Sequence, residues 1–344
     1  MNTSDPFAQA RVLEAESRYL EARDIFARLA DQGDADALTA LGKSLLFYPP
    51  VDFDRGIELI MRATQSYNGE ALRLCAVLSA QGAGLPQDWS AALGYLQSSA
   101  EYGLEAAQNE LRFLASAQGN DWKKLRDGID LKALLAPAKM QLMHTRPRIA
   151  IVEKFLTPEF CDWLIARAKP VMTRAEMINR EGEHYIGAGR SNSWSYFNLA
   201  EMDLAFVLLR MRISAITGLA VNGFEKTQVL HYAPGQQFAP HHDFLVPRLP
   251  EQKKMIDDWG QRVVTFLIYL NDEFDGAETS FLKLNWRCRG NKGDAILFRN
   301  VDANGLPDPT TLHEGLAPAR GEKWLLSQWI RIPPRRAAPM GMPA

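Results

Sequence analysis

The sequence predicts an α+β protein of two domains, an all-α domain of helical repeats followed by a domain built from strands. Alanine and leucine recur at helical spacing over residues 8–117, within segments that resemble one another. From Arg148 onward, apolar and polar residues alternate as they do in strands. A chain of 344 residues is long enough for two such domains. We expect a repeat domain over 1–117, a connector over 118–147, a strand-rich domain over 148–332 and a flexible tail over 333–344.

The repeats are marked by three glycines, Gly33, Gly69 and Gly103, each of which follows a similar alanine-containing segment. A period in this range is typical of paired helices stacked as a solenoid. We expect each glycine to end a helix in a left-handed turn, and a helix to span 89–102. Such a solenoid either presents a protein or peptide substrate or serves as a scaffold that shields the catalytic domain or mediates dimerisation.

The second half of the sequence contains residues that are typical of the first and last turns of helices. Thr157 followed by Pro158 predicts a capped helix start, and Gly218 predicts the end of a helix that begins near Glu201. Alternation of apolar residues makes 262–271 the clearest strand. The remaining expectations are two short helices in the connector, an edge strand over 148–155, a polar loop over 187–194 and a loop over 246–259 that acts as a mobile lid.

A candidate metal site lies in the tripeptide that begins at His241. Alternate side chains of a strand point to one face, so His241 and Asp243 can reach one metal ion together. His313 is the candidate third ligand. Two imidazoles and one carboxylate on one side of a metal form the facial triad of non-haem Fe(II) oxygenases.

A lone cation, Lys323, opens an apolar alternating segment close after His313. Period-two spacing places Lys323 on one face with Leu325, Ser327 and Trp329. A lysine on the inner face of a strand needs an anionic partner, because an unpaired buried charge is costly. A dicarboxylate that chelates the metal at one end and pairs with Lys323 at the other satisfies this need.

These motifs resemble the prolyl 4-hydroxylase family of 2-oxoglutarate- and Fe(II)-dependent oxygenases over residues 148–332. The family pattern of Tyr, Gly, aromatic residue and Pro-His-x-Asp is followed, as is the distal His with a Lys ten residues later. A Gly-Gly-x-Thr-x-Phe element is present with Ala277 in place of the second glycine. The matching residues are Tyr232, Gly235, Phe238, Pro240, His241, Asp243, Gly276, Thr279, Phe281, Lys292, Gly293, Ala295, His313, Lys323 and Trp329. The N-terminal repeats are similar to Sel1-like repeats, relatives of the tetratricopeptide repeat.

The resemblance implies a double-stranded β-helix, or jelly roll, buttressed by helices. It further implies Fe(II) on His241, Asp243 and His313, 2-oxoglutarate as cosubstrate, O2, and ascorbate as a candidate reductant. Lys323 and Tyr269 are then expected to bind the far carboxylate of 2-oxoglutarate, with Tyr232 near its metal-bound end. The expected substrate contacts are Arg190, Trp194 and Trp329.

The expected reaction is hydroxylation of an aliphatic C–H, with release of succinate and CO2, on a prolyl or other residue of a protein or peptide. Hydroxylation of a free amino acid or small molecule stays open, as does a non-catalytic adaptor that acts through its repeats. A halogenase or demethylase is a further alternative, although Asp243 argues against halogenation, which usually needs that carboxylate absent.

The composition indicates which kinds of partner and which cellular compartment to expect. A formal net charge of -2 implies no strong field for nucleic acid or a membrane surface. Cys75, Cys161 and Cys288 show no CxxC spacing, which favours free thiols in a reducing compartment. The first residues do not resemble a signal peptide, and no run of roughly 18 apolar residues is present. We therefore expect a cytoplasmic protein.

Overall fold

The computed structural model describes residues 5–136, 138–175, 177–178, 184–185, 187, 189–197 and 202–333. The chain forms two compact units, one of Met1–Ala136 with Leu199–Arg210 and the other of Pro137–Asn198 with Met211–Ala344. The domain boundaries expected from the sequence stay predictions. The expected tail, apart from Pro333, and the helix start at Glu201 lie outside the described residues.

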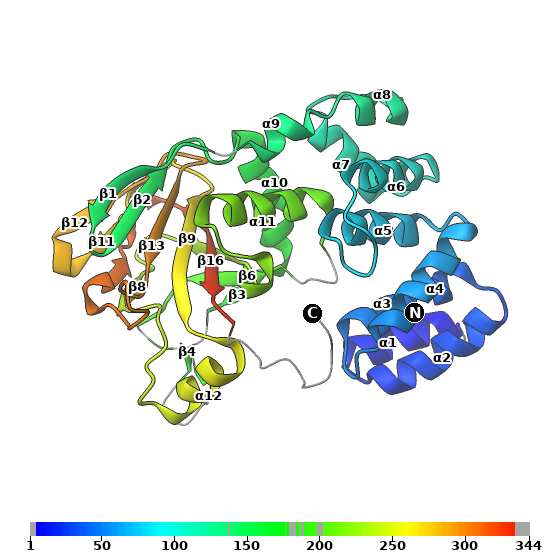
Figure 1. Ribbon diagram of the computed structural model, residues 1–344, viewed down its shortest axis with the longest axis horizontal. Helices are drawn as coiled ribbons and strands as arrows, with labels where there is room; N and C mark the ends of the chain where they lie inside the picture. The colour runs from blue at the N-terminus through cyan, green and yellow to red at the C-terminus, as the bar shows by residue number, and fades with distance from the viewer. Residues whose placement is uncertain are drawn as a thin grey trace, which may run out of the picture. The chain divides into compact units, whose positions relative to one another are not determined.

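Figure 1 shows the helices of the first unit, in which successive helices pack against one another. The helical repeats expected from the sequence are therefore confirmed. Aspartate and asparagine side chains cap the N-termini of α3, α5 and α6 by accepting backbone N–H hydrogen bonds. The helices are α1 (Pro6–Ala15), α2 (Tyr19–Asp31), α3 (Ala35–Phe47), α4 (Phe53–Gln65), α5 (Gly69–Gln81), α6 (Trp89–Glu101), α7 (Glu105–Leu114), α8 (Trp122–Asp127) and α9 (Leu131–Leu135).

The turns between repeats agree with two of the three predicted glycines. Gly33 and Gly103 follow α2 and α6 in the left-handed conformation, with φ of 90° and 88°. The prediction for Gly69 was wrong, because this residue begins α5. Tyr67, with φ of 55°, occupies the left-handed position after α4. The hydrogen-bonded turn therefore repeats, while the residue that adopts it varies.

The second unit contains two main antiparallel sheets, which confirms the expected jelly roll. The eight-stranded sheet has the order β1 (Gln141–Thr145), β2 (Arg148–Val152), β13 (Ala295–Arg299), β9 (Arg262–Tyr269), β16 (Lys323–Arg331), β7 (Gln228–Tyr232), β6 (Ser193–Tyr196) and β3 (Thr173–Arg174). The four-stranded sheet has the order β12 (Trp286–Cys288), β11 (Thr279–Phe281), β14 (His313–Gly315) and β8 (Phe238–His241). Two further pairs join β10 (Phe274–Gly276) to β15 (Pro318–Gly321) and β4 (Met177–Ile178) to β5 (His184–Tyr185).

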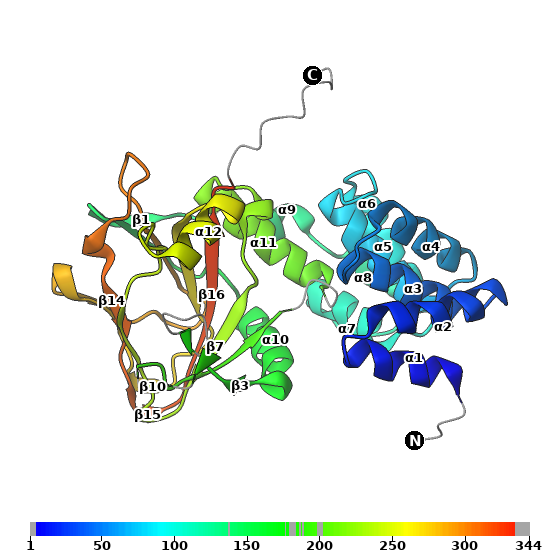
Figure 2. The ribbon, with the colours of Figure 1, turned by 90° about the horizontal axis from the view of Figure 1, so that it is seen from below.

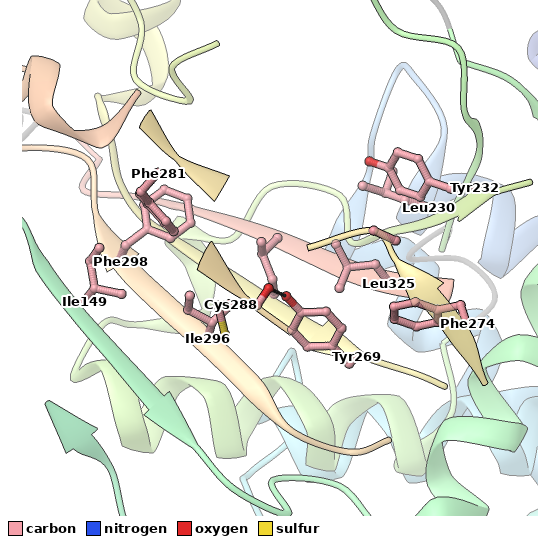
Figure 3. Close-up of a cluster of buried hydrophobic side chains, with 12 residues drawn as sticks. Ile149, Leu230, Tyr232, Tyr269, Phe274, Phe281, Cys288, Ile296, Phe298 and Leu325 are labelled. Atoms are coloured by element: carbon pink, nitrogen blue, oxygen red, sulfur yellow. Dashed lines mark hydrogen bonds between the residues drawn. The ribbon is translucent and has the colours of Figure 1, made fainter. Parts of the chain in front are cut away.

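An apolar core holds the two sheets together. Figure 3 shows its side chains, among them Phe281 from the smaller sheet and Phe298 and Leu325 from the larger one. The rings of Phe281 and Phe298 meet edge to face at 5.0 Å between centroids. Because alternate residues of each strand point into this layer, polar residues placed in the same alternation lie between the sheets.

Helices flank the larger sheet, and three of their features were expected. The helix α10 (Pro158–Ala168) begins at Pro158, and the hydroxyl of Thr157 accepts a hydrogen bond from the Phe160 N–H. The helix α11 (Leu204–Thr217) ends before Gly218, whose φ is 69°. Figure 2 shows α10 beside the larger sheet, on the side away from β14. None of the helices in the described part of the chain has the length and apolar composition that a membrane crossing requires.

Two further expectations about local structure were wrong. The strand at 148–152 is not an edge strand, because β1 pairs with it on its outer side. The segment 246–259, expected to be a loop, contains the helix α12 (Pro250–Trp259). Pro250 stands in the first turn of α12, and Lys253 pairs with Asp257 one turn later.

Candidate metal centre

The pairing of β8 with β14 builds the centre of the site. His241 ends β8, His313 begins β14, and the two residues are partners across the ladder. Their ring centroids lie 4.3 Å apart. Asp243, two residues beyond β8, places its Oδ1 3.5 Å from His241 Nε2 and its Oδ2 3.6 Å from His313 Nε2. The structure therefore brings the three predicted ligands together, with ligand atoms all within 4.8 Å of one another.

Backbone carbonyls orient both imidazoles. The Nδ1–H of His241 donates to the carbonyl of Ala239 at 2.8 Å, and that of His313 donates to the carbonyl of Thr311 at 3.0 Å. With Nδ1 engaged, each Nε2 keeps a free lone pair directed at the centre. Burial lowers the pKa of His313 to about 4, so its imidazole is neutral at physiological pH.

A buried polar relay holds the carboxylate of Asp243. The hydroxyl of Thr265 donates to Asp243 Oδ2 at 2.7 Å, and the amide of Asn300 donates to that hydroxyl at 2.9 Å. Thr265 and Asn300 are both fully buried. Burial alone would raise the pKa of Asp243, but the two imidazoles and the Thr265 hydroxyl hold it well below its usual value. Sequence reasoning missed this relay because it joins a residue of β9 to Asp243, which follows β8, and the two segments meet only in the folded chain.

The donor set fits Fe(II). Two imidazole nitrogens and one carboxylate oxygen come together here, the donor set of the facial triad, which leaves further coordination positions of a metal open. Each ligand side chain is also held by a hydrogen bond, to Ala239, Thr311 or Thr265, as metal ligands in proteins normally are. The residues present are therefore suited to hold the iron that the sequence predicts.

Lys323 lies at the far end of the same cavity. It is 1% exposed, and it faces Tyr232 across the β16–β7 ladder. Its ammonium donates to the carbonyl of Ala277 at 2.7 Å and lies over the rings of Tyr232 and Tyr269, at 5.5 and 5.2 Å. Among the described residues no carboxylate lies within ion-pair distance of it. Burial lowers the pKa of Lys323 to about 8.

The cavity joins these two ends. Its walls include the three metal ligands and Lys323. They also include the other residues that the sequence places on the same face of β16 as Lys323, namely Leu325, Ser327 and Trp329. The predicted alternation of β16 is therefore confirmed. The remaining wall combines the apolar side chains of Leu230, Leu267 and Phe238 with polar ones, among them Arg190, Gln228, Thr279 and Glu314. A ligand that spans the cavity can meet the metal at one end and a cation at the other, in surroundings that exclude water.

The two predicted tyrosines differ in position. Tyr232 lines the cavity, and burial raises its pKa to about 12. Tyr269 is fully buried in the core cluster, where its hydroxyl donates to the carbonyl of Cys288 at 3.0 Å (Figure 3). The same hydroxyl lies 3.0 Å from Thr279 Oγ1. Thr279, which sequence reasoning missed as a site residue, lines the cavity, whereas Tyr269 is not among the lining residues. The contact of Tyr269 with the cosubstrate therefore stays a prediction.

Two of the three predicted substrate residues belong to the cavity wall. Arg190 and Trp329 line it. Arg190 is 5% exposed, and its guanidinium lies 4.5 Å from the ring centroids of both Trp194 and Phe238. Trp194, expected in a loop, belongs to β6. The indole of Trp329 carries the guanidinium of Arg262 on its face, 3.6 Å from the centroid.

Two further histidines, His231 and His242, lie close to the metal motif in the sequence. His231 points away from Tyr232 and pairs with Glu322 at 3.0 Å. His242 lies 3.2 Å from the carbonyl of Pro309 through its Nε2. Neither belongs to the group of side chains that can share a metal ion in the described part of the chain.

Comparisons with known proteins identify the family. Residues 227–331 match the model of the 2OG-Fe(II) oxygenase superfamily. Prolyl 4-hydroxylase 1 of Arabidopsis thaliana is 30% identical over 208 residues, which cover 56% of this chain and 72% of the relative. Prolyl 4-hydroxylase 5 of the same plant is 30% identical over 217 residues, with 56% and 71% covered.

Comparison with solved structures matches the viral collagen prolyl hydroxylase of Paramecium Bursaria Chlorella virus-1, at 26% identity and a TM-score of 0.42, with 53% of this chain and 95% of that chain covered. A Sel1 repeat protein from Oxalobacter formigenes is 20% identical at a TM-score of 0.29, with 38% and 61% covered. The family assignment rests on the sequence relatives and on the site geometry. This chain belongs to the prolyl 4-hydroxylase family of 2-oxoglutarate- and Fe(II)-dependent oxygenases.

Proposed function

We propose that this protein hydroxylates a prolyl residue of a protein or peptide, with release of succinate and CO2. The observation that carries the proposal is the single cavity lined at one end by His241, Asp243 and His313 and at the other by the buried Lys323. Members of this family use Fe(II), 2-oxoglutarate and O2, and the prolyl 4-hydroxylases among its relatives supply the substrate class.

When bound, iron and 2-oxoglutarate supply the oxidising chemistry, in which O2 provides the oxygen atom that enters the substrate C–H bond. The protein supplies the geometry. The triad residues would hold the metal through His241 Nε2, His313 Nε2 and the Asp243 carboxylate. The ammonium of Lys323 would pair with the far carboxylate of 2-oxoglutarate. This carboxylate would be the anionic partner that the buried ammonium does not find among the described residues of the protein.

The walls of the cavity restrict water and orient the cosubstrate. The rings of Tyr232 and Tyr269 lie beside the Lys323 ammonium, and the Tyr269 hydroxyl is hydrogen-bonded to the hydroxyl of Thr279 in the cavity wall. We propose that Tyr232 and Thr279 contact the cosubstrate directly. Tyr269 then acts by fixing the hydroxyl of Thr279.

The substrate enters, in this proposal, beside Arg190, Trp194 and Trp329. The guanidinium of Arg190 is stacked between two aromatic rings and therefore presents a preorganised donor to a peptide carbonyl. The indole of Trp329 offers an apolar face for a prolyl ring, an arrangement supported by its place in the cavity wall.

The remaining proposals concern the setting of the reaction. We propose that the helical repeats, of Sel1-like type, dock the protein substrate and that ascorbate is the reductant that maintains the iron. The three free cysteines support a reducing compartment, for which we propose the cytoplasm.

The proposal is tested with purified full-length protein, Fe(II), 2-oxoglutarate and ascorbate. Succinate formation is measured with prolyl peptides, with free proline and with no substrate, and products are examined by mass spectrometry. We expect prolyl peptides to stimulate succinate formation and to gain one oxygen atom each. The His241→Ala variant should reduce both signals to background, because it removes one of the metal ligands.

Succinate formation stimulated by free proline alone would replace the peptide substrate with a small molecule. Loss of a methyl group from the peptide, in place of oxygen gain, would indicate a demethylase. Absence of any 2-oxoglutarate turnover, with iron bound, would leave the repeats as the functional part of an adaptor.

A further inference from the structure

Two polar side chains in the wall of the oxygenase cavity have a buried atom without a partner. The amide oxygen Oε1 of Gln228 and the indole nitrogen Nε1 of Trp329 make no hydrogen bond with any described residue. Gln228 as a whole is 2% exposed. Because a buried polar atom that is left unpaired is costly and uncommon, these two atoms indicate a ligand that offers one donor and one acceptor.

Strand alternation directs the side chain of Gln228 into the cavity. Gln228, Leu230 and Tyr232 are alternate residues of β7, and all three line the cavity. Ser327 of β16 is the ladder partner of Gln228 and also belongs to the wall, yet it leaves Oε1 of Gln228 unpaired. The neighbouring strand therefore does not satisfy this acceptor.

The two unpaired atoms belong to the part of the cavity beside the metal ligands. Gln228 is four residues from Tyr232, the ladder partner of Lys323, and this separation is about 13 Å along an extended strand. Trp329 faces Thr265 across the β16–β9 ladder, and the hydroxyl of Thr265 holds the carboxylate ligand of the metal centre. A cosubstrate that pairs with Lys323 would leave this part of the cavity to the substrate that is hydroxylated.

A peptide group matches the two atoms in chemistry and in span. Trp329 is two residues beyond Ser327, so Gln228 and Trp329 are diagonal neighbours, which lie about 7–8 Å apart on one face of a sheet. In a trans peptide group the N–H and the C=O point in opposite directions. Such a group between the two side chains would make two hydrogen bonds of about 2.9 Å each and fill that distance.

We propose that Gln228 and Trp329 recognise the peptide group that follows the target prolyl residue. The prolyl nitrogen of a polypeptide carries no hydrogen, so the nearest N–H on the carboxyl side is that of the next residue. Gln228 Oε1 accepts this N–H, and Trp329 Nε1 donates to the prolyl carbonyl. Resting on the proposed function, the inference narrows the substrate to prolyl residues followed by any residue other than proline. A second proline would leave the amide oxygen of Gln228 unpaired.

The test compares two prolyl peptides that differ in one group. One has glycine after the target proline, and the other has glycolic acid, in which an ester oxygen replaces the N–H without added bulk. With full-length wild-type protein, Fe(II), 2-oxoglutarate and ascorbate, kcat/KM should be at least tenfold lower for the ester, because a site that hydrogen-bonds a group rejects the analogue without it. A peptide with a second proline at this position should also be a poor substrate.

Two variants separate the two proposed hydrogen bonds. Gln228→Met replaces the amide with an apolar group of similar size, so it should lower kcat/KM for the glycine peptide about tenfold and make the two peptides nearly equal. Trp329→Phe keeps an aromatic face and removes the N–H, so it should lower kcat/KM for both peptides by similar factors. Gln32→Met, the same substitution at an exposed position of the repeats, is the matched control and should change neither.

Circular dichroism and the KM for 2-oxoglutarate establish that the variants fold with an intact cosubstrate site, and the wild-type comparison of the two peptides does not depend on them. Equal kcat/KM for the glycine and ester peptides in the wild type, or a preference that persists in Gln228→Met, would overturn the inference and leave prolyl hydroxylation in place. Hydroxylation of neither peptide, with iron bound, would refute the proposed function and the inference together.

Discussion

The repeat unit and the oxygenase unit place their functional residues by different means. In the repeats, neighbouring helices pack in sequence order, and equivalent positions such as Ala40 and Leu74 form one surface. In the oxygenase, ladder register brings together His241 and His313, which are far apart in the chain. A surface of this kind tolerates exchange of single residues, whereas the oxygenase site depends on a few buried polar groups. Substitutions in the oxygenase site should therefore change mainly activity, and substitutions in the repeats should change mainly stability.

The Lys323 end of the oxygenase cavity should give the largest effect. Lys323→Ala should raise the KM for 2-oxoglutarate by about 100-fold, because truncating one partner of a buried charge pair costs about 2–5 kcal/mol. Iron affinity should change little, since Lys323 is not a ligand. Steady-state succinate formation and metal titration measure the two quantities, with the exposed Lys253→Ala as a control. An unchanged KM would remove Lys323 from the cosubstrate site.

The same lysine predicts a dependence on pH. Burial lowers its pKa to about 8, from an ordinary value of 10.5, while Glu278 and Cys288 oppose the shift. The ammonium that we propose as the partner of the cosubstrate is therefore lost above about pH 8, and the KM for 2-oxoglutarate should rise there. Folding stability in the absence of cosubstrate should change in the opposite direction: it should increase with pH, whereas cosubstrate binding weakens. Between about pH 8 and 10.5 the unfolded chain binds more protons at this residue, so stability rises with pH.

Lys323→Arg should shift the rise in KM to higher pH, because a guanidinium stays charged. The measurement is the KM for 2-oxoglutarate from pH 7 to 9.5, with tyrosine titration at Tyr232 kept outside this range by its pKa of about 12. A KM that is constant over this interval in the wild type would contradict the assignment.

The relay behind Asp243 should have an intermediate effect. Thr265→Val removes the hydrogen bond to Asp243 Oδ2 and should weaken metal binding by about 10–100-fold, as loss of a hydrogen bond to a metal ligand commonly does. Thr265→Ser should restore most of the affinity. Electron paramagnetic resonance of bound Mn(II) measures binding without turnover. Thr279→Val is the matched control, since it should affect 2-oxoglutarate more than metal, and equal metal affinity of the Val and Ser variants at position 265 would refute the relay.

A substitution in the repeats should change stability alone. A Cβ at Gly42 would lie 2.9 Å from Ile60 and 3.0 Å from the carbonyl of Gly56, so Gly42→Ala should destabilise the repeats by about 1–3 kcal/mol. Gly94 on α6 has open space around it, and Gly94→Ala should stabilise by about 1 kcal/mol. Urea unfolding measures both, with 2-oxoglutarate turnover expected to stay constant under native conditions. Equal destabilisation by the two alanines would contradict the close helix contact.

The smallest effect is expected at Ala277, where the family pattern has a glycine. Ala277 has a φ of 57°, a left-handed conformation that costs a residue with a side chain about 1 kcal/mol, so Ala277→Gly should be neutral or stabilise by about this amount. Its carbonyl should continue to accept the hydrogen bond from Lys323, leaving the KM for 2-oxoglutarate unchanged. Thermal unfolding checks the first expectation, and a loss of stability would show that the side chain contributes packing.

Period and spacing predicted a large part of the fold. Alternation in β16 placed Lys323, Leu325, Ser327 and Trp329 on one face, and all four line the cavity. The helix at Pro158 was predicted from its cap, because capping is a local interaction. The metal ligands could be predicted because their residue types and order carry the chemistry.

What remained hidden depends on contacts between distant segments. The Thr265–Asn300 relay joins β9 to the residue after β13, and no local pattern in the sequence marks it. The helix α12 has no buried residue, so apolar periodicity gave no sign of it, although the Lys253–Asp257 spacing is helical. Gly69 was misplaced because a glycine can start a helix as well as end one, and Tyr67 took the turn.

The direct pairing of His241 with His313 limits how this family can vary in length. An insertion or deletion of one residue within β8 or β14 would rotate one imidazole to the opposite side of its sheet and separate the pair. Additions between the strands, as in the turn at 302–306, leave that pairing intact. Natural and engineered length changes should therefore accumulate in the connecting turns, and grafting a new specificity onto this scaffold is best attempted there.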